Sequence, residues 1–334
     1  MKKALIIAAI ALQVFVLAYS AGEREWVVRT GTKVFLRTAP IDPRDLFRGD
    51  YVSLDYDIST IPITTIRGFT ENKKGAKGLK IYTVLREGLN GLAEFNYATY
   101  GKPATGLFIR GRQGYNWRFG SAKRALAVRY GIESYYVQQG SGREIEQRHG
   151  VRNAIQVPLE MEVAVGRNGI AVIRGHRWSS LGIGLEVIEN AVQEGKQVRK
   201  SARMRLTLLN ASQAPLAIVN LADMCSFSLE VVAWASQDHR AADRHCSGIK
   251  PSNADIILLQ PGEKRPFDFD LTERRWYVTG KDVPVEIGSL NRSEMFRIVY
   301  RPPSPESCVG LQNAQLIYHG ALPSRAFHGR GTID

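Results

Sequence analysis

Acidic and basic side chains alternate in a short stretch near the start of the chain, where they could bind an anion or act on a substrate. The charged residues of this stretch are Asp42, Arg44, Asp45, Arg48 and Asp50. Arginine guanidiniums can hold an acidic group through two parallel hydrogen bonds. The same pattern also suits an ionic turn, because Asp42 precedes a proline and Gly49 can adopt positive φ without penalty. The turn is the favoured interpretation, with an anion site as the alternative.

A second segment repeats the combination of tyrosine, glycine and acid at residues 130–136. If this segment pairs with the strand that begins at Tyr51, Tyr51, Asp55, Glu133 and Tyr135 could share one polar face. Such a face would form a pocket in which carboxylates from the two segments converge. The structural alternative is cross-strand packing of Tyr130 and its neighbours, which stabilises sheets without any chemistry.

The usual catalytic patterns are missing from the chain. No GxSxG elbow, HExxH zinc motif or Walker A run occurs. The enzymatic alternative is therefore a hydrolase that uses Asp50, Asp55 or Glu133 on the polar face of the 51–58 strand. The densest group of metal-binding residue types is Asp238, His239, Asp243, His245 and Cys246, but arginines lie among them and argue against a cation. We expect no metal and no cofactor.

Alternation with a period of two dominates the sequence from residue 26 onward, which predicts a mainly β protein. In the strand at 51–58, Val52, Leu54, Tyr56 and Ile58 point to one side, and the polar residues point to the other. Asn168-Gly169 predicts a tight hairpin. Further strands in the first half are predicted at 26–28, 33–38, 81–86, 107–112, 115–119, 125–137, 161–165 and 170–173, with a short helix at 144–149.

Residues 49–56 read Gly-Asp-Tyr-Val-Ser-Leu-Asp-Tyr, which is the GDYxxLxY signature letter for letter. Together with residues 38–45, 130–136 and 163–173, this motif resembles the GDYxxLxY family of bacterial envelope proteins over about residues 26–180. The resemblance implies a membrane-anchored protein whose first domain, residues 22–185, is antiparallel β. It implies no chemistry, because the family has no established activity.

The N-terminus predicts export. Lys2 and Lys3 precede an apolar run over residues 4–21 that is interrupted only by Gln13. Small residues at 20–22 would suit cleavage of a signal peptide. Bulky residues at 14–17 and a tyrosine at the interface position favour an uncleaved anchor instead. We expect a single-pass protein of the cell inner membrane, with the bulk of the chain in the periplasm.

The second half of the chain is predicted to be a separate β domain. A polar stretch at 186–200 suggests a linker, followed by an immunoglobulin-like β-sandwich over 201–334. Its strands are predicted at 204–209, 227–234, 256–259, 266–271, 296–300 and 314–318. Cys225 and Cys246 are the expected disulfide pair in an oxidising compartment, with Cys308 left over, although pairing cannot be deduced from spacing.

The net charge of +13 suits an anionic partner, and it suits equally well a basic proteome with solvated surface lysines and arginines. Nucleic acid is an unlikely partner for an exported protein, so anionic lipid or glycan is expected. The region between Glu94 and Glu133 has no acidic residue and interleaves aromatic residues with Lys102, Arg110, Arg112, Arg118, Lys123, Arg124 and Arg129. This pattern suits a solvated outer face of a sheet, with an anionic membrane surface and a single-stranded nucleic acid groove as the alternatives. The favoured role is a non-enzymatic envelope module that binds a protein partner or an anionic envelope component. A structural spacer is a further alternative.

Overall fold

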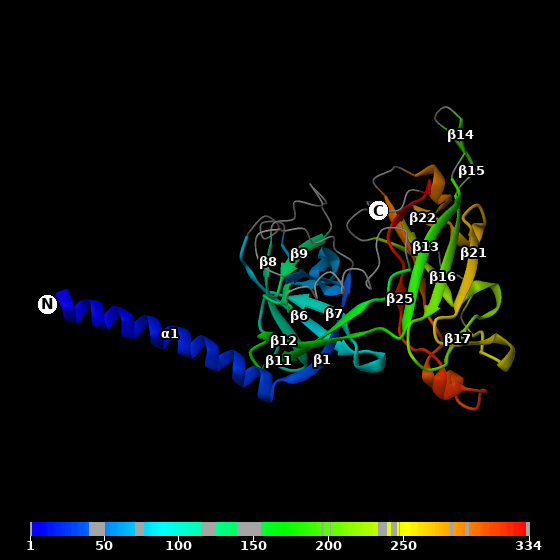
Figure 1. Cartoon of the computed structure of the whole chain (residues 1–334). Coiled ribbons are helices and arrows are strands. Elements are labelled where there is room, and N and C mark those ends of the chain that lie inside the picture. The colour runs from blue at the N-terminus through cyan, green and yellow to red at the C-terminus, as the bar shows by residue number, and fades with distance from the viewer. Residues whose placement is uncertain are drawn as a thin grey trace. The chain divides into compact units, whose positions relative to one another are not determined.

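The computed structural model describes residues 2–39, 51–70, 77–114, 125–138, 155–190, 192–194, 197–200, 202–232, 239–241, 246, 248–280, 283–290 and 294–331. As predicted, the chain is mainly β, with one N-terminal apolar helix and several antiparallel sheets (Figure 1). It divides into two compact units. The first unit contains helix α1 and strands β1–β12, and the second contains strands β13–β26.

Helix α1 (Lys2–Thr30) is long and apolar enough to cross a membrane, with a mean hydropathy of 2.3 in its most apolar window. None of that window is buried against the rest of the described chain. Its large apolar residues from Leu5 to Tyr19 are exposed. A signal sequence has the same length and composition, so these properties fit both an anchor and a leader.

The strand predicted at residues 26–28 is wrong, because α1 continues through this segment to Thr30. The last turns are stabilised locally by an ion pair between Arg29 and Glu25 at 2.6 Å, four residues apart. Gly31 then ends the helix, and its N–H donates to the carbonyl of Val27 at 2.8 Å. A Cβ on Gly31 would lie 2.6 Å from that carbonyl oxygen, so the close approach requires glycine.

The hairpin predicted at Asn168-Gly169 is confirmed. It joins β11 (Leu159–Val165) to β12 (Ala171–Trp178), and Gly169 has φ +78°. These strands extend a four-stranded sheet of order β12-β11-β1-β3, which also contains β1 (Thr32–Ala39) and β3 (Asp55–Tyr56). The turn of this hairpin receives the end of α1, because Val27 is buried there and the Asn168 side chain donates to Glu23 at 3.1 Å.

A six-stranded sheet forms the other large part of the first unit. Its order is β4-β9-β8-β6-β7-β5. The strands are β4 (Thr60–Pro62), β9 (Ala125–Arg129), β8 (Leu107–Gln113), β6 (Lys80–Glu87), β7 (Ala93–Thr99) and β5 (Ile66–Arg67). One face buries Ile81, Thr83, Ile109 and Val128, while the opposite face is more exposed.

Two long predicted strands are interrupted in the structure. The 51–58 segment forms β2 (Tyr51–Ser53), β3 and the 3-10 turn η1 (Asp57–Ser59), although its alternate apolar residues are all buried as predicted. The 125–137 segment splits into β9 and β10 (Ser134–Tyr136) at Gly131, which has φ +82°. The predictions at 115–119 and 144–149 lie outside the described residues.

The described residues of the second unit form five sheets. The first has the order β13-β16-β21, with β13 (Leu181–Glu189), β16 (Arg203–Asn210) and β21 (Lys264–Asp270). Another joins β18 (Phe227–Val231), β24 (Met295–Tyr300), β25 (Leu322–Pro323) and β26 (Phe327–His328). The smaller sheets are β17 (Leu216–Val219) with β20 (Ile256–Leu259), β14 (Val192–Glu194) with β15 (Gln197–Lys200), and β19 (His239–Ala241) with β22 (Val278–Gly280) and β23 (Val283–Val285).

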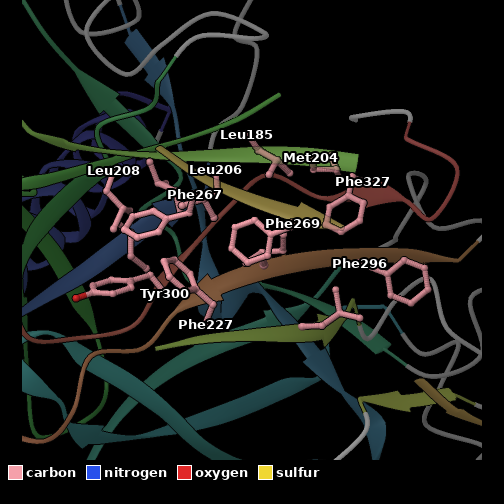
Figure 2. Close-up of a cluster of buried hydrophobic side chains, with 14 of the residues drawn as sticks. Leu185, Met204, Leu206, Leu208, Phe227, Phe267, Phe269, Phe296, Tyr300 and Phe327 are labelled. Carbon is pink, nitrogen blue, oxygen red and sulfur yellow. The ribbon is translucent and has the colours of Figure 1, made fainter. Parts of the chain in front are cut away.

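One aromatic core holds the second unit together (Figure 2). Phe227 of β18 contacts Phe267 and Phe269 of β21, with ring centroids 4.8 and 5.3 Å apart. It also contacts Tyr300 of β24 at 5.4 Å. These rings therefore join the β13-β16-β21 sheet to the β18-β24 sheet through side chains that alternate inward along each strand.

Two predictions in this half need correction. Residues 314–318 form the 3-10 turn η10 (Ala314–Leu316) instead of a strand, after Asn313 takes the left-handed conformation with φ 57°. The predicted linker at 186–200 contains strand residues, because β13 runs to Glu189 and β14 pairs with β15. Hydrophobic periodicity did not distinguish these elements, because a segment of three or four residues is too short to show a strand or a turn by its pattern of polar and apolar residues.

Candidate functional site

Part of the predicted site lies outside the described residues. This part comprises Asp42, Arg44, Asp45, Arg48, Gly49 and Asp50. Of Tyr51 the structure describes the backbone, which belongs to β2. The candidate site is therefore built from Tyr51–Tyr56 and from the second segment, residues 130–136.

The two segments lie side by side as antiparallel partners. Strand β10 pairs with β2, with Ser134 opposite Ser53 and Tyr135 opposite Val52. Just beyond the paired region, the N–H of Leu54 donates to the carbonyl of Glu133 at 2.8 Å. Sequence could not reveal this pairing, because about 80 residues separate the strands and strand order depends on the whole sheet.

Two buried tyrosines hold the segments together reciprocally. Tyr56, the last residue of the GDYxxLxY motif, donates its hydroxyl to the carbonyl of Ile132 at 2.7 Å. Tyr130 donates in return to the carbonyl of Ile58, also at 2.7 Å. The Thr83 hydroxyl lies 2.7 Å from the Tyr130 oxygen. Because Tyr130 uses its own hydrogen on Ile58, Thr83 must be the donor in that bond.

Burial keeps both tyrosines protonated. Desolvation is the largest cause that raises the pKa of Tyr56 well above its ordinary value, and the charge of Glu133 adds to it. Desolvation likewise raises the pKa of Tyr130, while the bond from Thr83 opposes the shift and the charges of Glu133 and Asp55 support it. A neutral phenol that donates to a backbone carbonyl is a structural group, and it cannot serve as a base at neutral pH.

The carboxylate of Glu133 closes the turn that separates β9 from β10. One oxygen accepts the N–H of Tyr130, and the other accepts the N–H of Gly131 at 3.0 Å. Gly131 needs its positive φ to bring both N–H groups toward the same carboxylate. Asp55 lies close enough to influence Tyr130 electrostatically. Both acids are therefore near the tyrosine pair, and Glu133 is held by backbone N–H groups.

Tyr135 does not lie on the polar face that was predicted for the 51–58 strand. Because it lies opposite Val52 in the register, its side chain emerges on the face of Val52. There it contacts His176 of β12, with the hydroxyl 3.2 Å from Nδ1 and the ring centroids 5.5 Å apart. The expected pocket built from Tyr51, Asp55, Glu133 and Tyr135 is thus not assembled in this form.

Sequence reasoning missed a buried charge cluster in the same unit. Glu160, whose side chain is 5% exposed, accepts from Arg37 at 3.3 Å and from Arg177 at 2.7 Å. Arg177 also donates to the carbonyl of Asn90 at 2.6 Å and lies 3.7 Å above the Phe35 ring. Two glutamates, Glu160 and Glu162, inside the otherwise apolar strand β11 were the signal that could have found it, since buried acids are almost always paired.

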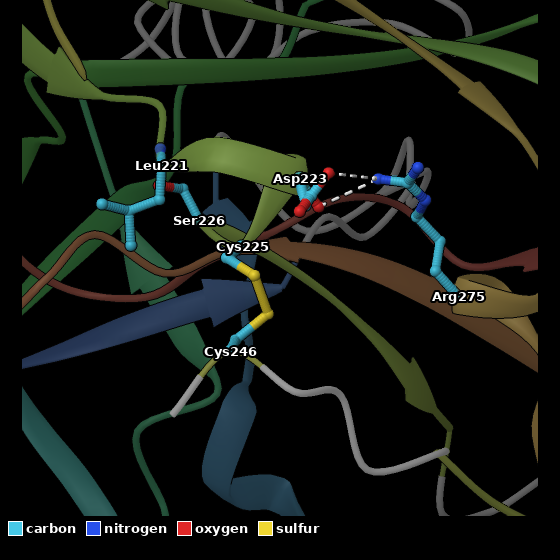
Figure 3. Close-up of a disulfide and its surroundings, with 6 residues drawn as sticks. All are labelled: Leu221, Asp223, Cys225, Ser226, Cys246 and Arg275. Carbon is cyan, nitrogen blue, oxygen red and sulfur yellow. Dashed lines mark hydrogen bonds and ion pairs between the residues drawn. A yellow bond between two sulfur atoms is a disulfide. The ribbon is translucent and has the colours of Figure 1, made fainter. Parts of the chain in front are cut away.

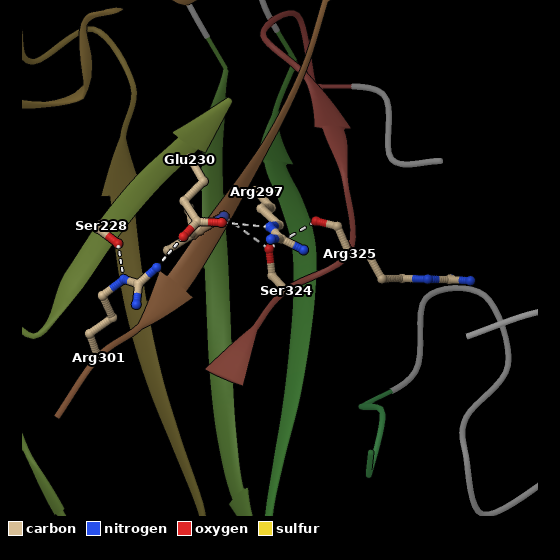
Figure 4. A network of polar contacts seen from close by, with 7 residues as sticks. Ser228, Glu230, Arg297, Arg301, Ser324 and Arg325 are labelled. Atoms are coloured by element: carbon tan, nitrogen blue, oxygen red, sulfur yellow. Dashed lines mark hydrogen bonds and ion pairs between the residues drawn. The ribbon is translucent and has the colours of Figure 1, made fainter. Parts of the chain in front are cut away.

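A second missed network lies on β18 and β24 (Figure 4). Glu230 accepts from Arg297 at 2.8 Å and also from Arg301, and Arg301 donates to Ser228 at 3.1 Å. Burial raises the pKa of Glu230, but the two guanidiniums outweigh burial, so its pKa lies below the ordinary value. The carboxylate is saturated by these partners, which favours a structural role.

The cysteines of the second unit follow the expected pairing (Figure 3). Cys225 and Cys246 form a disulfide with Cα atoms 5.6 Å apart. The turn before Cys225 is fixed by Arg275, which donates to the carbonyl of Asp223 at 3.1 Å. Cys308 is free and buried, and desolvation raises the pKa of its thiol, which makes it a poor nucleophile.

The group of metal-binding residue types is largely outside the described part of the chain. Of its members, His239 bonds through Nδ1 to Glu294 at 2.8 Å, and Cys246 is consumed by the disulfide. Asp238, Asp243 and His245 are not described. Among the residues that the structure places, no group of three or more histidines, cysteines or acids could hold a metal ion.

Comparison with known proteins agrees with the motif geometry. Residues 13–175 match the family model described as GDYXXLXY protein. The match begins inside α1 and includes both segments of the tyrosine pair and the hairpin that receives the helix end. No curated protein and no solved structure matches the chain. The first half of this chain, residues 13–175, belongs to the GDYXXLXY protein family.

Proposed function

We propose that the protein is a membrane-anchored envelope module that binds a protein partner or an anionic envelope component and performs no catalysis. One observation carries this proposal: the groups that could have done chemistry hold the fold together. The hydroxyls of Tyr56 and Tyr130 donate to backbone carbonyls, and both oxygens of Glu133 accept backbone N–H groups. A hydrolase would need a carboxylate directed at a substrate, and the Glu133 carboxylate is instead directed at these backbone groups.

In this proposal α1 remains attached and spans the cell inner membrane once, with both units in the periplasm. The bulky residues at 14–17 support an uncleaved helix. The contacts of Glu23 and Val27 with the β11–β12 turn join the end of the helix to the first unit. The second unit is proposed to be an immunoglobulin-like sandwich. The aromatic core shared by its two larger sheets supports that assignment.

The anchor is tested by membrane extraction at alkaline pH, followed by mass measurement of the mature N-terminus. We expect the full chain, including residues 2–21, in the membrane pellet. A soluble chain that begins near residue 22 would contradict the anchor.

The absence of catalysis is tested with Glu133→Gln in the full chain. The glutamine amide offers one acceptor oxygen where the carboxylate offers two, so one backbone N–H loses its partner and unfolding should become easier by about 1–3 kcal/mol. The matched control is Glu87→Gln, since Glu87 is exposed at the end of β6. A Glu133→Gln protein that keeps wild-type stability yet loses its cellular role would favour the hydrolase.

A further inference from the structure

A row of three cations crosses the exposed face of the six-stranded sheet. Lys80 of β6 lies directly opposite Arg112 of β8, and Arg112 lies directly opposite Arg129 of β9. All three side chains are exposed. Like charges placed opposite each other on neighbouring strands destabilise a sheet. The row therefore lowers the stability of the sheet, so its presence is better explained by an interaction with a partner than by folding.

The row lacks counter-charges within the described part of the chain. No ion pair joins Lys80, Arg112 or Arg129 to a carboxylate there, and Arg112 donates only to the carbonyl of Gly78 at 3.2 Å. Some arginines elsewhere on exposed strands do have acidic partners. Arg86 pairs with Glu94 at the other end of β6, and on the second unit Arg205 pairs with Asp268. Among the described residues, the row thus differs from these two strand surfaces, each of which includes a counter-charge.

The same face carries further positive charge and aromatic surface. Arg110 lies two residues before Arg112 on β8 and opposite Tyr82 of β6. Across the sheet, Arg67 of β5 lies 3.5 Å above the ring of Tyr97. Because residues two apart on a strand point to the same side, these side chains extend the cationic row into a cationic face.

This face is continuous with the end of α1. The N–H of Arg110 donates to the carbonyl of Gly169 at 2.8 Å, and the adjacent Asn168 holds Glu23 of the helix. Glu23 follows the apolar run by only two residues, about 3 Å along the helix axis. Arg112 lies about 7 Å beyond Arg110 along β8. This spacing is comparable with the Debye length of about 8 Å at physiological ionic strength.

We propose that this cationic face, defined by Lys80, Arg110, Arg112 and Arg129, binds the anionic phospholipid headgroups of the bilayer that holds α1. The proposal rests on the membrane anchor of the proposed function and names its ligand. An anionic bilayer supplies the charges that the row lacks, and the helix end brings the hairpin beside Arg110 to the membrane surface. The net charge of +13 acts in the same direction.

The size of the effect follows from the charges. A lysine or arginine near an anionic leaflet contributes about 1 kcal/mol, which corresponds to about fivefold in an equilibrium constant. Neutralising all three residues of the row should therefore shift the equilibrium between bilayer-bound and free positions of the face by about 100-fold. Salt should reduce the same equilibrium, because exposed charges are screened.

The experiment uses the full chain held in nanodiscs by α1. A fluorophore on Thr99→Cys reports on the face, because Thr99 lies opposite Tyr82 on β7. The other cysteines are a disulfide and a buried thiol. Quenching by a headgroup-attached quencher is compared between phosphatidylcholine alone and phosphatidylcholine mixed with phosphatidylglycerol. We expect stronger quenching with phosphatidylglycerol, and its loss in high salt and in a variant that combines Lys80→Gln, Arg112→Gln and Arg129→Gln.

The matched control makes the same change of charge on the second unit, through Lys250→Gln, Lys264→Gln and Arg265→Gln, all at exposed residues. It should keep the lipid preference. A variant with only Lys80→Gln and Arg129→Gln retains the Arg112 bond to Gly78, and its unfolding midpoint should be no lower than that of the wild type.

Three outcomes would overturn the inference. If quenching is equal in both lipids while the chain stays in the nanodisc, the lipid inference is wrong but the membrane anchor still holds. The cationic face would then be expected to bind a protein partner. Equal losses in the triple variant and in the control overturn it too, because net charge would then be the cause. A chain that the nanodisc does not retain overturns the membrane anchor and this inference together.

Discussion

Removing the Tyr130 hydroxyl tests whether the reciprocal tyrosine pair holds the GDYxxLxY motif in place. Tyr130→Phe keeps the buried ring but deletes two hydrogen bonds, to the carbonyl of Ile58 and from the hydroxyl of Thr83, both 2.7 Å long. Thr83 is fully buried and Tyr130 is nearly so. Water therefore cannot readily replace the lost partner.

The expected loss is worked from these two bonds. Each buried polar group left without a partner costs about 1–3 kcal/mol, so the loss of both bonds should lower the free energy of unfolding of the first unit by about 2–6 kcal/mol. Adding Thr83→Val removes one of the two orphaned groups. The double variant should therefore be at least as stable as Tyr130→Phe alone, because two apolar partners of similar shape restore the packing.

The assay is denaturant unfolding of the full chain in detergent, followed by tryptophan fluorescence and near-ultraviolet circular dichroism. Tyr97→Phe is the matched control, since the Tyr97 hydroxyl has no hydrogen bond to any residue that the structure describes. The transition of the second unit serves as an internal reference if the two units unfold separately. If Tyr130→Phe shifts the first transition no more than Tyr97→Phe does, the tyrosine pair does not hold the motif.

Three further predictions concern the other clusters. Since the pKa of Glu230 is lower in the folded state, its contribution to the free energy of unfolding is present above the unfolded pKa of about 4.3 and is lost as pH falls through the folded pKa. Glu230→Gln should therefore weaken the loss of stability in acid, measured by urea unfolding at graded pH. Glu160→Gln removes the buried carboxylate that pairs with Arg37, whose side chain is 10% exposed, and with Arg177, whose side chain is 37% exposed. It should cost about 3–5 kcal/mol by the same unfolding measurement, whereas a loss below about 1 kcal/mol would contradict the buried cluster. Reducing the Cys225–Cys246 disulfide, which closes a separation of 21 residues, should lower the stability of the second unit by about 3 kcal/mol in calorimetry, with the first unit unchanged.

Local patterns predicted much of the first unit. The alternation at 51–58 identified Val52, Leu54, Tyr56 and Ile58 as the buried side, and all four are buried. Asn168-Gly169 identified the hairpin, because a glycine with positive φ in a short turn is a local property. The helix end was mistaken for a strand because Trp26-Val27-Val28 has strand-forming residues, while the contacts that keep it helical include long-range ones to Gly166 and Asn168.

The candidate site was predicted less completely. The two segments that meet were both identified, but their register was not, so Tyr135 was placed on the wrong face. A shift of one residue between paired strands exchanges the two faces, and nothing within either segment sets that register. The Glu160 cluster and the alignment of the cationic row were not predicted for the same reason, since their members come from different strands whose pairing no local pattern sets.

By itself, the sequence determined the properties that depend on neighbouring residues: an apolar N-terminal helix, a mainly β chain and membership of the GDYXXLXY family over residues 13–175. Only the tertiary structure decided what the motif does. Its last tyrosine is bonded to Ile132, and Tyr130 is bonded back to Ile58. The physical reason is that a hydroxyl becomes either a reactive group or a structural one according to its burial and its partner, and both are set by strands brought together from distant parts of the chain.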